Sequence, residues 1–341
     1  MTTESVMHMV SFELKVKVSA AAELPAPSHI AASVFLPDPA KLTSPPVAIF
    51  AFPGGGYSKG YFDLHLTGHS GYSQAEHHVE RGIVFIAADH LGVGASSIPD
   101  LTALSIETVA AANDAAIREI SARLETGSLG PGLPPLRGLV TIGIGQSMGG
   151  CITIVMQGRQ ATCNAIACLG FSAIHTVLPQ RTEAARQRGI AANKLFRNHD
   201  LTKPARGRGA MGELDFLYPF HWEDVPQDLL DADIRSGYPV RKTTPRWGSA
   251  TVPAFARLML SPGYVAQEAA AIEAPVLIAA GERDVVPDPH AEPAAFKSSR
   301  DVSVYVVPNM AHMHNFASTR RLLWDRIADW ACMVAREARR S

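Results

Sequence analysis

The stretch 139-LVTIGIGQSMGGC-151 carries the strongest structural signal in this chain of 341 residues. Its first six residues are nearly all apolar, as in a strand covered on both faces, and a helical pattern begins at 148. The turn between them reads G-x-S-x-G. A serine at such a turn has strained backbone angles, and the flanking glycines let strand and helix pack closely. The pattern predicts Ser147 as a nucleophile, with the Met148 N–H at a helix N-terminus facing any oxyanion formed there.

Other apolar runs of strand length recur along the chain, at 47–52, 83–88, 165–169, 276–280 and 302–307. Helical patterns lie between them, at 73–81, 106–124, 148–160 and 318–338. Strands that alternate with helices predict an α/β fold with a mostly parallel central sheet flanked by helices. Two alternating stretches at 11–18 and 30–36 predict an antiparallel pair before it.

Charge and composition argue against several classes of protein. Lysine and arginine number 31 against 32 acids, so no overall positive field favours nucleic acid. Apolar runs stop far short of the roughly twenty residues of a membrane span. The four cysteines lack metal-site spacing. No lysine or arginine precedes Lys15, so we expect no secretory signal. We expect a cytoplasmic protein that acts on a small molecule and is compatible with a homodimer.

A glycine loop, Phe52-Pro53-Gly54-Gly55-Gly56-Tyr57, follows the strand at 47–52. Glycines let backbone N–H groups approach a ligand closely, so this loop is a candidate source of a second oxyanion donor. Another glycine-rich turn, 89-DHLGVGAS-96, follows the strand at 83–88. It does not have the G-x-G-x-x-G spacing of a dinucleotide site.

Taken together, these motifs resemble those of the α/β-hydrolase family. The glycine loop resembles the family's HGGG-type oxyanion loop, with Pro53 where histidine is usual. The resemblance implies an oxyanion hole formed by the N–H groups of Met148 and Gly55, with Gly56 as the second choice in the loop. It also implies a chain order of serine, acid and histidine.

The acid and the base follow from that resemblance. The stretch 281-GERDVVP-287 resembles the family's G-x-x-D-x-x-P loop and assigns the acid to Asp284, with Glu282 and Asp288 as competitors. The loop after the strand at 302–307 holds two histidines, and the family spacing selects His312 as the base. His314 then lines the site or contacts the start of the last helix.

A metal site is the weaker interpretation of the histidines. An H-x-H pair is also a metal-ligand pattern, but such a site needs further ligands. Four histidines, His65, His69, His77 and His78, are candidates without supporting spacing. We therefore expect no metal and no cofactor.

The interval 173–274 shows no strand–helix alternation. The family commonly inserts a cap after its sixth strand, so we expect a largely helical cap at 173–274 and a catalytic core made of 1–172 and 275–341. Its basic segment 181–208 and acidic segment 213–233 are either solvated surfaces or a basic lip for an anionic substrate. Aromatic residues at every second position from 216 to 222 indicate a local cap core, a strand face or an apolar substrate wall. The predicted substrate-binding residues are Tyr57, Phe216, Tyr218, Trp222 and His314.

The combined prediction is a serine hydrolase that cleaves a carboxylic ester, or a related acyl bond, of a small to medium, partly apolar substrate. An acyltransferase or a C–C bond hydrolase would use the same triad. A ligand-binding receptor without catalysis is the alternative from another class.

Overall fold

The computed structural model describes residues 10–24, 27–130, 133–196, 216–234, 241 and 243–339, the backbone alone over 192–196. Its eight-stranded sheet has the order β1-β2-β4-β3-β5-β6-β7-β8. The pairs β1–β2 and β2–β4 are antiparallel, and all later pairs are parallel. The strands are β1 Val10–Lys17, β2 His29–Leu36, β3 Val47–Phe52, β4 Val84–Ala88, β5 Val140–Gln146, β6 Ala165–Leu169, β7 Val276–Arg283 and β8 Val302–Ala311. The predicted mostly parallel α/β fold is confirmed.

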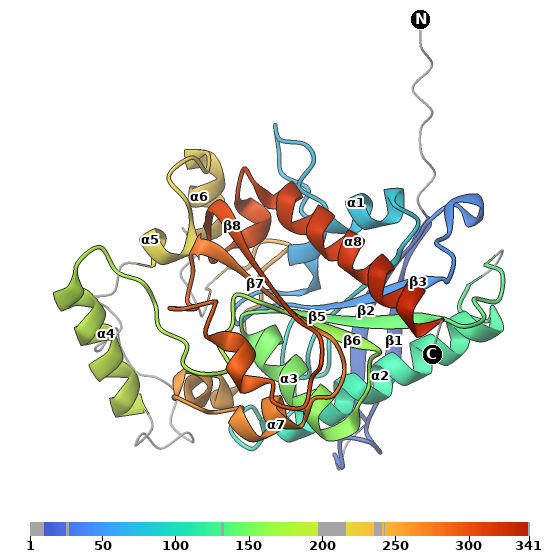
Figure 1. Cartoon of the computed structure of the whole chain (residues 1–341), viewed down its shortest axis with the longest axis horizontal. Coiled ribbons are helices and arrows are strands. Elements are labelled where there is room, and N and C mark those ends of the chain that lie inside the picture. Colours follow the sequence, from blue (N-terminus) through green and yellow to red (C-terminus); the bar gives the residue numbers. More distant parts are fainter. Residues whose placement is uncertain are drawn as a thin grey trace, which may run out of the picture.

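Helices cover both faces of this sheet (Figure 1). Those of the described residues are α1 Gln74–Glu80, α2 Ile106–Thr126, α3 Met148–Gln160, α4 Glu183–Phe196, α5 Leu217–Phe220, α6 Gln227–Ile234, α7 Ala266–Ala271 and α8 Arg320–Ala338. In Figure 1, α1 and α8 lie on one side of the sheet and α2, α3 and α7 on the other.

Strand β3 shows why the central strands are apolar throughout. Its residues Val47, Ile49 and Ala51 join the core that includes α8, while Ala48, Phe50 and Phe52 join the core that includes α2 and α3. Successive side chains of a strand point to opposite faces, so a strand between two helical layers needs apolar residues at every position.

Helix α2 begins and ends at capping residues that the sequence supplies. Ser105 precedes α2 and accepts a hydrogen bond from the backbone N–H of Thr108, which satisfies one of the free amides of the first turn. Gly127 ends the helix in the left-handed region, at φ 71°. The predicted helices at 73–81, 106–124, 148–160 and 318–338 correspond to α1, α2, α3 and α8.

The last two strands are longer than predicted. β7 continues to Arg283 and β8 to Ala311, because the two strands pair again, Arg283 with Ala311, after an irregularity near Gly281. Asp284 and His312 therefore each follow the end of a strand directly.

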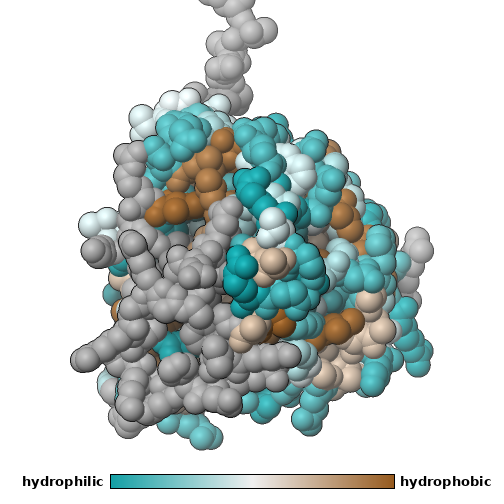
Figure 2. Space-filling view, turned by 90° about the vertical axis from the view of Figure 1, so that its left-hand side faces the viewer, coloured by the Kyte–Doolittle hydropathy of each residue, from teal (hydrophilic) through white to brown (hydrophobic). Residues whose placement is uncertain are grey.

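The interval 173–274 is described in part: 197–215, 235–240 and residue 242 lie outside the described residues, and these include 197–208 of the segment considered as a basic lip. The described part contains α4, α5, α6, a 3₁₀-helix at Ala254–Leu260, and α7. Figure 2 shows the side of the molecule where α4, α5 and α6 lie, with hydrophobic residues in separate patches among hydrophilic ones. No described helix is both long and apolar enough to cross a membrane.

Candidate active site

Ser147 stands at a strained turn between β5 and α3. Its backbone has φ 54° and ψ −117°, in the left-handed half of conformational space that costs a non-glycine residue energy. The glycines on either side are required by packing. A Cβ at Gly145 would lie 2.2 Å from the Gly149 carbonyl oxygen, and a Cβ at Gly149 would lie 2.2 Å from that of Phe52. The G-x-S-x-G pattern thus follows from the close approach of β3, β5 and α3.

Asp284 and His312 form a buried hydrogen-bonded pair. His312 Nδ1 donates to Asp284 Oδ1 at 2.6 Å, and both residues are almost inaccessible to solvent. The carboxylate also accepts the backbone N–H groups of Gly281 at 2.9 Å and Val285 at 2.7 Å. The hydrogen bond from His312 Nδ1 to Asp284 fixes the tautomer of the imidazole, so the Nε2 lone pair is free to accept a proton.

His314 is the second imidazole on the same carboxylate. Its Nε2 donates to Asp284 Oδ2 at 2.7 Å, and its buried Nδ1 has no hydrogen-bond partner. Burial alone would raise the pKa of Asp284, but the charges and hydrogen bonds of the two histidines hold that pKa well below its usual range. The carboxylate therefore stays ionised. His314 thus contacts Asp284, as His312 does.

Ser147 is joined to this pair through β6. The Ser147 N–H donates to the Leu169 carbonyl at 2.8 Å, and the next residue, Gly170, has φ 59°. A Cβ at Gly170 would lie 3.0 Å from both Asp284 Oδ2 and His312 Nδ1. The end of β6 thus packs against Asp284 and His312 while it also fixes the backbone of Ser147.

Within the described residues, no hydrogen bond joins the Ser147 hydroxyl to His312. The amide of Gln146 lies beside the imidazole instead, with its Nε2 3.5 Å from His312 Nε2 and 3.0 Å from the His312 carbonyl oxygen. Sequence analysis did not single out Gln146, although it is the first variable position of G-x-S-x-G. Catalytic hydrogen bonds are often unformed before substrate binds, so this geometry does not exclude a Ser147–His312 contact in catalysis.

The glycine loop lies against the start of α3. Tyr57 N–H donates to Gly54 O at 3.2 Å, which closes a turn with Gly56 at φ 81°. A Cβ at Gly55 would lie 3.8 Å from Met148 Sδ, so the two predicted oxyanion donors, Gly55 and Met148, are neighbours.

The loop is anchored from β4 by His90. His90 Nε2 donates to the Pro53 carbonyl oxygen at 3.1 Å, and Asn113 Nδ2 donates to His90 Nδ1 at 2.9 Å. Burial lowers the pKa of His90 to about 4, so the ring is neutral near neutral pH. A histidine from the loop after the neighbouring strand, β4, thus fixes the carbonyl of the proline that stands where histidine is usual.

Asp89, also at the end of β4, is buried and supports the next turn. It accepts the backbone N–H groups of Lys59 at 2.6 Å and Ala95 at 2.8 Å. Burial raises its pKa to about 6, although these bonds act in the opposite direction. A Cβ at Gly94 would lie 2.3 Å from Asp89 Oδ2, which explains the glycine there.

The predicted aromatic wall packs in several different ways. Tyr218 and Trp222 contact the guanidinium of Arg283, with its central carbon 4.0 Å and 4.5 Å from their ring centres. Phe216 packs against Phe220, with ring centroids 5.5 Å apart. Because residues 217–220 form α5, the alternating pattern is not a strand face.

Phe220, not among the predicted substrate-binding residues, contacts His312 itself. Their ring centroids are 5.1 Å apart. The backbone supports this contact, because the N–H groups of His312 and Met313 donate to the carbonyls of Pro219 and Phe220 at 3.0 Å and 2.8 Å. The pattern of aromatic residues included Phe220, but nothing local indicated that it, rather than its neighbours, covers the imidazole.

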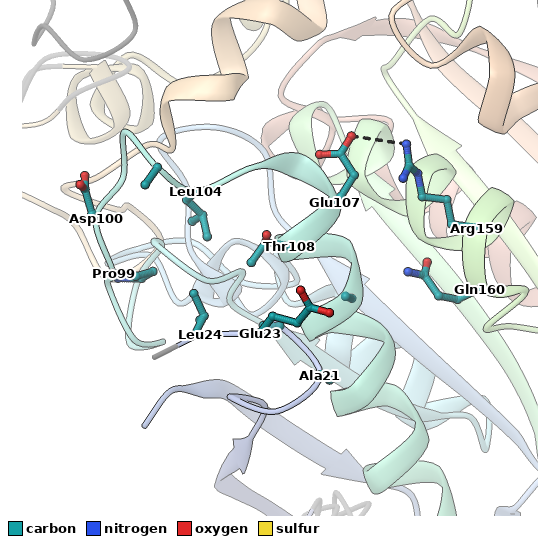
Figure 3. A pocket seen from close by; sticks show the side chains of 13 residues that line it. Ala21, Glu23, Leu24, Pro99, Asp100, Leu104, Glu107, Thr108, Arg159 and Gln160 are labelled. Atoms are coloured by element: carbon teal, nitrogen blue, oxygen red, sulfur yellow. Dashed lines mark hydrogen bonds and ion pairs between the residues drawn. The ribbon is translucent and has the colours of Figure 1, made fainter. Parts of the chain in front are cut away.

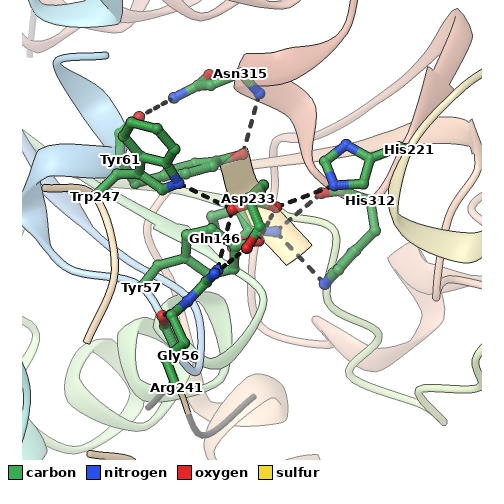
Figure 4. Close-up of polar contacts among 10 residues, drawn as sticks. All are labelled: Gly56, Tyr57, Tyr61, Gln146, His221, Asp233, Arg241, Trp247, His312 and Asn315. Atoms are coloured by element: carbon green, nitrogen blue, oxygen red, sulfur yellow. Dashed lines mark hydrogen bonds and ion pairs between the residues drawn. The ribbon is translucent and has the colours of Figure 1, made fainter. Parts of the chain in front are cut away.

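A second buried polar cluster lies behind the glycine loop (Figure 4). Asp233 of α6 is at its centre and accepts side-chain hydrogen bonds from Tyr57, His221, Arg241 and Trp247. The predicted substrate residue Tyr57 is fully buried, and its hydroxyl lies 2.7 Å from Asp233 Oδ2. No local motif marked Asp233: three of its partners lie 8 to 14 residues away without a recognisable pattern, and Tyr57 lies 176 residues away.

A candidate metal-ligand cluster and two cavities do not include Ser147. Among the described residues, ligating atoms of Asp63, His65 and Glu76 lie within 4.8 Å of one another. They adjoin a 480 Å³ cavity that His69 also lines, and His65 Nε2 is already paired with Asp63 at 3.0 Å. Figure 3 shows a 570 Å³ cavity along the start of α2, and no residue of the predicted triad lines it.

Comparison with known proteins identifies the fold. No protein-family model and no curated protein sequence matches the chain. Among solved structures, a malate-bound esterase from Thermogutta terrifontis is 16% identical, with a TM-score of 0.57 over 95% of this chain and 99% of its own. Proline iminopeptidase from Mycobacterium smegmatis is 17% identical (TM-score 0.60; coverage 96% and 100%). A peroxisomal alpha-beta-hydrolase from Saccharomyces cerevisiae is 13% identical (TM-score 0.56; coverage 97% and 90%). The chain therefore has the α/β-hydrolase fold.

Proposed function

We propose that this protein is a serine hydrolase that cleaves a carboxylic ester, or a related acyl bond, of a small to medium, partly apolar substrate. The observation that carries the proposal is the buried pair of His312 and Asp284, 2.6 Å apart, adjoining a serine at a strained turn. A structural serine has no need of left-handed backbone angles or of a buried histidine–carboxylate pair nearby. The similar esterase and iminopeptidase support a hydrolase only at the level of fold.

In the proposed reaction His312 Nε2 takes the proton of the Ser147 hydroxyl as its oxygen attacks the acyl carbon. Asp284 holds the Nδ1–H of the ring and stabilises the imidazolium that forms. The N–H groups of Met148 and Gly55 bind the oxyanion, the first aided by the N-terminal end of α3. His312 then protonates the leaving group and activates a water molecule, which releases the acid from the acyl-enzyme.

The side chain of Gln146 must move away before the Ser147 proton can pass to His312 Nε2. Its amide now lies next to His312 Nε2, where the Ser147 hydroxyl must donate. A side-chain rotation of Gln146 on substrate binding would free that nitrogen. The cap proposed at 173–274 would supply the substrate walls, with Phe220 against His312 and Phe216 packed on Phe220.

The position of Gln146 also supports the second candidate function, a ligand-binding receptor without catalysis. A fluorophosphonate probe separates the two, because it labels only a serine activated by its base. We expect the wild-type chain to be labelled at Ser147, and Ser147→Ala to be unlabelled. A folded wild-type protein that resists the probe would favour the receptor.

Hydrolysis is then measured with p-nitrophenyl esters from acetate to palmitate. Ser147→Ala should lower the rate on the order of 10⁴-fold or more, and undiminished activity in that variant contradicts the mechanism. Added alcohols distinguish acyl transfer, which gives a new ester, from hydrolysis, which gives the acid alone.

A further inference from the structure

We infer that Asp233 is a positioning residue that acts through Arg241 to hold the glycine loop in the shape of an oxyanion hole. The inference rests on the proposed function and extends it to a residue far from the serine in sequence. Asp233 touches none of the proposed reacting groups; its effect passes through the backbone of Gly56.

The first observation is the burial and bonding of the Asp233 carboxylate. Its side chain is 1% exposed and accepts from Tyr57 at 2.7 Å, Trp247 at 2.9 Å and Arg241 Nη2 at 3.0 Å. His221 Nε2 also donates, at 3.0 Å. A buried charge is tolerated only with such compensation, so the cluster has one well-defined arrangement.

The second observation is the reach of Arg241 in two directions. One side of its guanidinium binds Asp233, through the carboxylate and through the backbone carbonyl of that residue. The other side points to the loop, where Nε donates to the Gly56 carbonyl oxygen at 3.3 Å. The guanidinium carbon also lies 5.0 Å from the centre of the Tyr57 ring. The rigid fork of arginine joins the acid to the loop, a geometry that lysine cannot reproduce.

The third observation is that the Gly56 carbonyl is held from two segments. The Ser249 N–H donates to the same oxygen at 3.0 Å, and Ser58 N–H donates to the Trp247 carbonyl at 2.9 Å. Glycine peptides rotate easily, so a turn of three glycines keeps one orientation only if its carbonyls are fixed. With Pro53 held by His90 and Gly56 held by Arg241, the peptide groups between them are fixed at both ends.

Asp233→Asn tests the inference, because it keeps the shape of the side chain and removes the charge that orients Arg241. We expect kcat for an ester to fall on the order of 10- to 100-fold with KM nearly unchanged, as misplaced catalytic groups produce. Asp228→Asn is the matched control, because Asp228 lies on the same helix and pairs with His69 at the surface, at 2.8 Å.

A comparison of ester with thionoester substrates distinguishes positioning from stability. The sulfur of a thionoester accepts hydrogen bonds poorly, so a formed oxyanion hole favours the oxygen ester. We expect Asp233→Asn to reduce this preference on the order of 10-fold. A lower kcat with the wild-type preference retained would overturn the inference and leave a structural role alone.

Two further measurements keep the result decisive. If Asp233→Asn does not fold, Arg241→Lys should still lower the preference for the oxygen ester, because it keeps a positive charge near Asp233 but loses the Gly56 contact.

Hydrogen exchange of the amides at 54–58 should be faster in either variant, with exchange in β5 unchanged. Equal exchange in variant and wild type would overturn the inference without reference to activity. If Ser147→Ala retains the hydrolysis, the proposed function fails, while the exchange result still decides the link between Asp233 and the loop.

Discussion

The ring of Phe220 packs against the imidazole of His312, with 5.1 Å between centroids and 36° between planes. Phe220 is itself buried, so it shields the proposed base from water on that side. The contact joins the segment around α5 to the loop after β8, which are far apart in the sequence.

Phe220→Ala should therefore affect both stability and catalysis. Removal of a buried phenylalanine typically costs about 3 kcal/mol of unfolding free energy, because a cavity remains. Water that enters beside His312 should also lower kcat about 10-fold. Chemical denaturation and ester hydrolysis measure the two effects, and Phe220→Leu, which keeps most of the volume, should lose little of either. A stable Phe220→Ala variant with wild-type kcat would contradict this role.

The two histidines on Asp284 should differ strongly in effect. Only His312 has its second nitrogen near Gln146 and the serine turn, so His312→Ala should lower kcat on the order of 10³-fold or more. His314→Ala leaves the carboxylate bound to His312 and to two backbone N–H groups, and should lower kcat only about 10-fold. Steady-state kinetics of the two variants test the assignment, and the reverse order would make His314 the base.

Gly170 offers a test of packing against the acid and the base. A methyl group there would lie 3.0 Å from Asp284 Oδ2 and from His312 Nδ1. Gly170→Ala should lower kcat on the order of 10²-fold, because the pair must shift. Gly138→Ala is the matched control: it has φ 68°, close to the 59° of Gly170, but open space around its Cβ position. Both variants should lose about 1 kcal/mol from backbone strain, and only the first should lose activity.

The raised pKa of Asp89 predicts a pH dependence of stability. The folded state binds a proton on Asp89 with a pKa of about 6, against 3.8 for the ordinary carboxyl. Its contribution to stability is therefore fully present below the unfolded pKa and is lost as the pH rises through about 6. Urea unfolding of the wild type and of Asp89→Asn, which stays neutral, measures this contribution. Between about pH 7 and about pH 5 the unfolding free energy of the wild type should rise by about 1 kcal/mol relative to that of Asp89→Asn. Parallel curves of unfolding free energy against pH would refute the raised pKa of Asp89.

The fold could be predicted because its signals are local. The central strands are covered on both faces and so appear as unbroken apolar runs, such as Val47–Phe52. The serine turn, the glycine loop and the loops that begin at Asp284 and His312 were marked by short patterns, since each needs glycine or a turn directly after a strand. The predicted strands at 276–280 and 302–307 end earlier than β7 and β8. The last pair, Arg283 with Ala311, forms only when the two strands lie side by side.

The residues that support the candidate site could not be predicted, because their contacts depend on the tertiary structure. Tyr57 and Asp233 are 176 residues apart in the chain and meet only in the folded protein. Tyr218 and Trp222 were expected at the substrate wall because they are aromatic, but they contact Arg283, next to the proposed acid. Composition indicates that such residues are buried somewhere, and only the tertiary structure shows against what.

The location of the Asp233 cluster limits how this protein could be re-engineered. Chimeras in which one α/β-hydrolase receives the cap of another treat that segment as a transferable module. Here Asp233, Arg241 and Trp247 come from the segment to be exchanged, whereas Gly56 and Tyr57 come from the recipient. A graft of 173–274 alone would bring a buried carboxylate without its tyrosine partner, so a working transplant must carry the glycine loop with it.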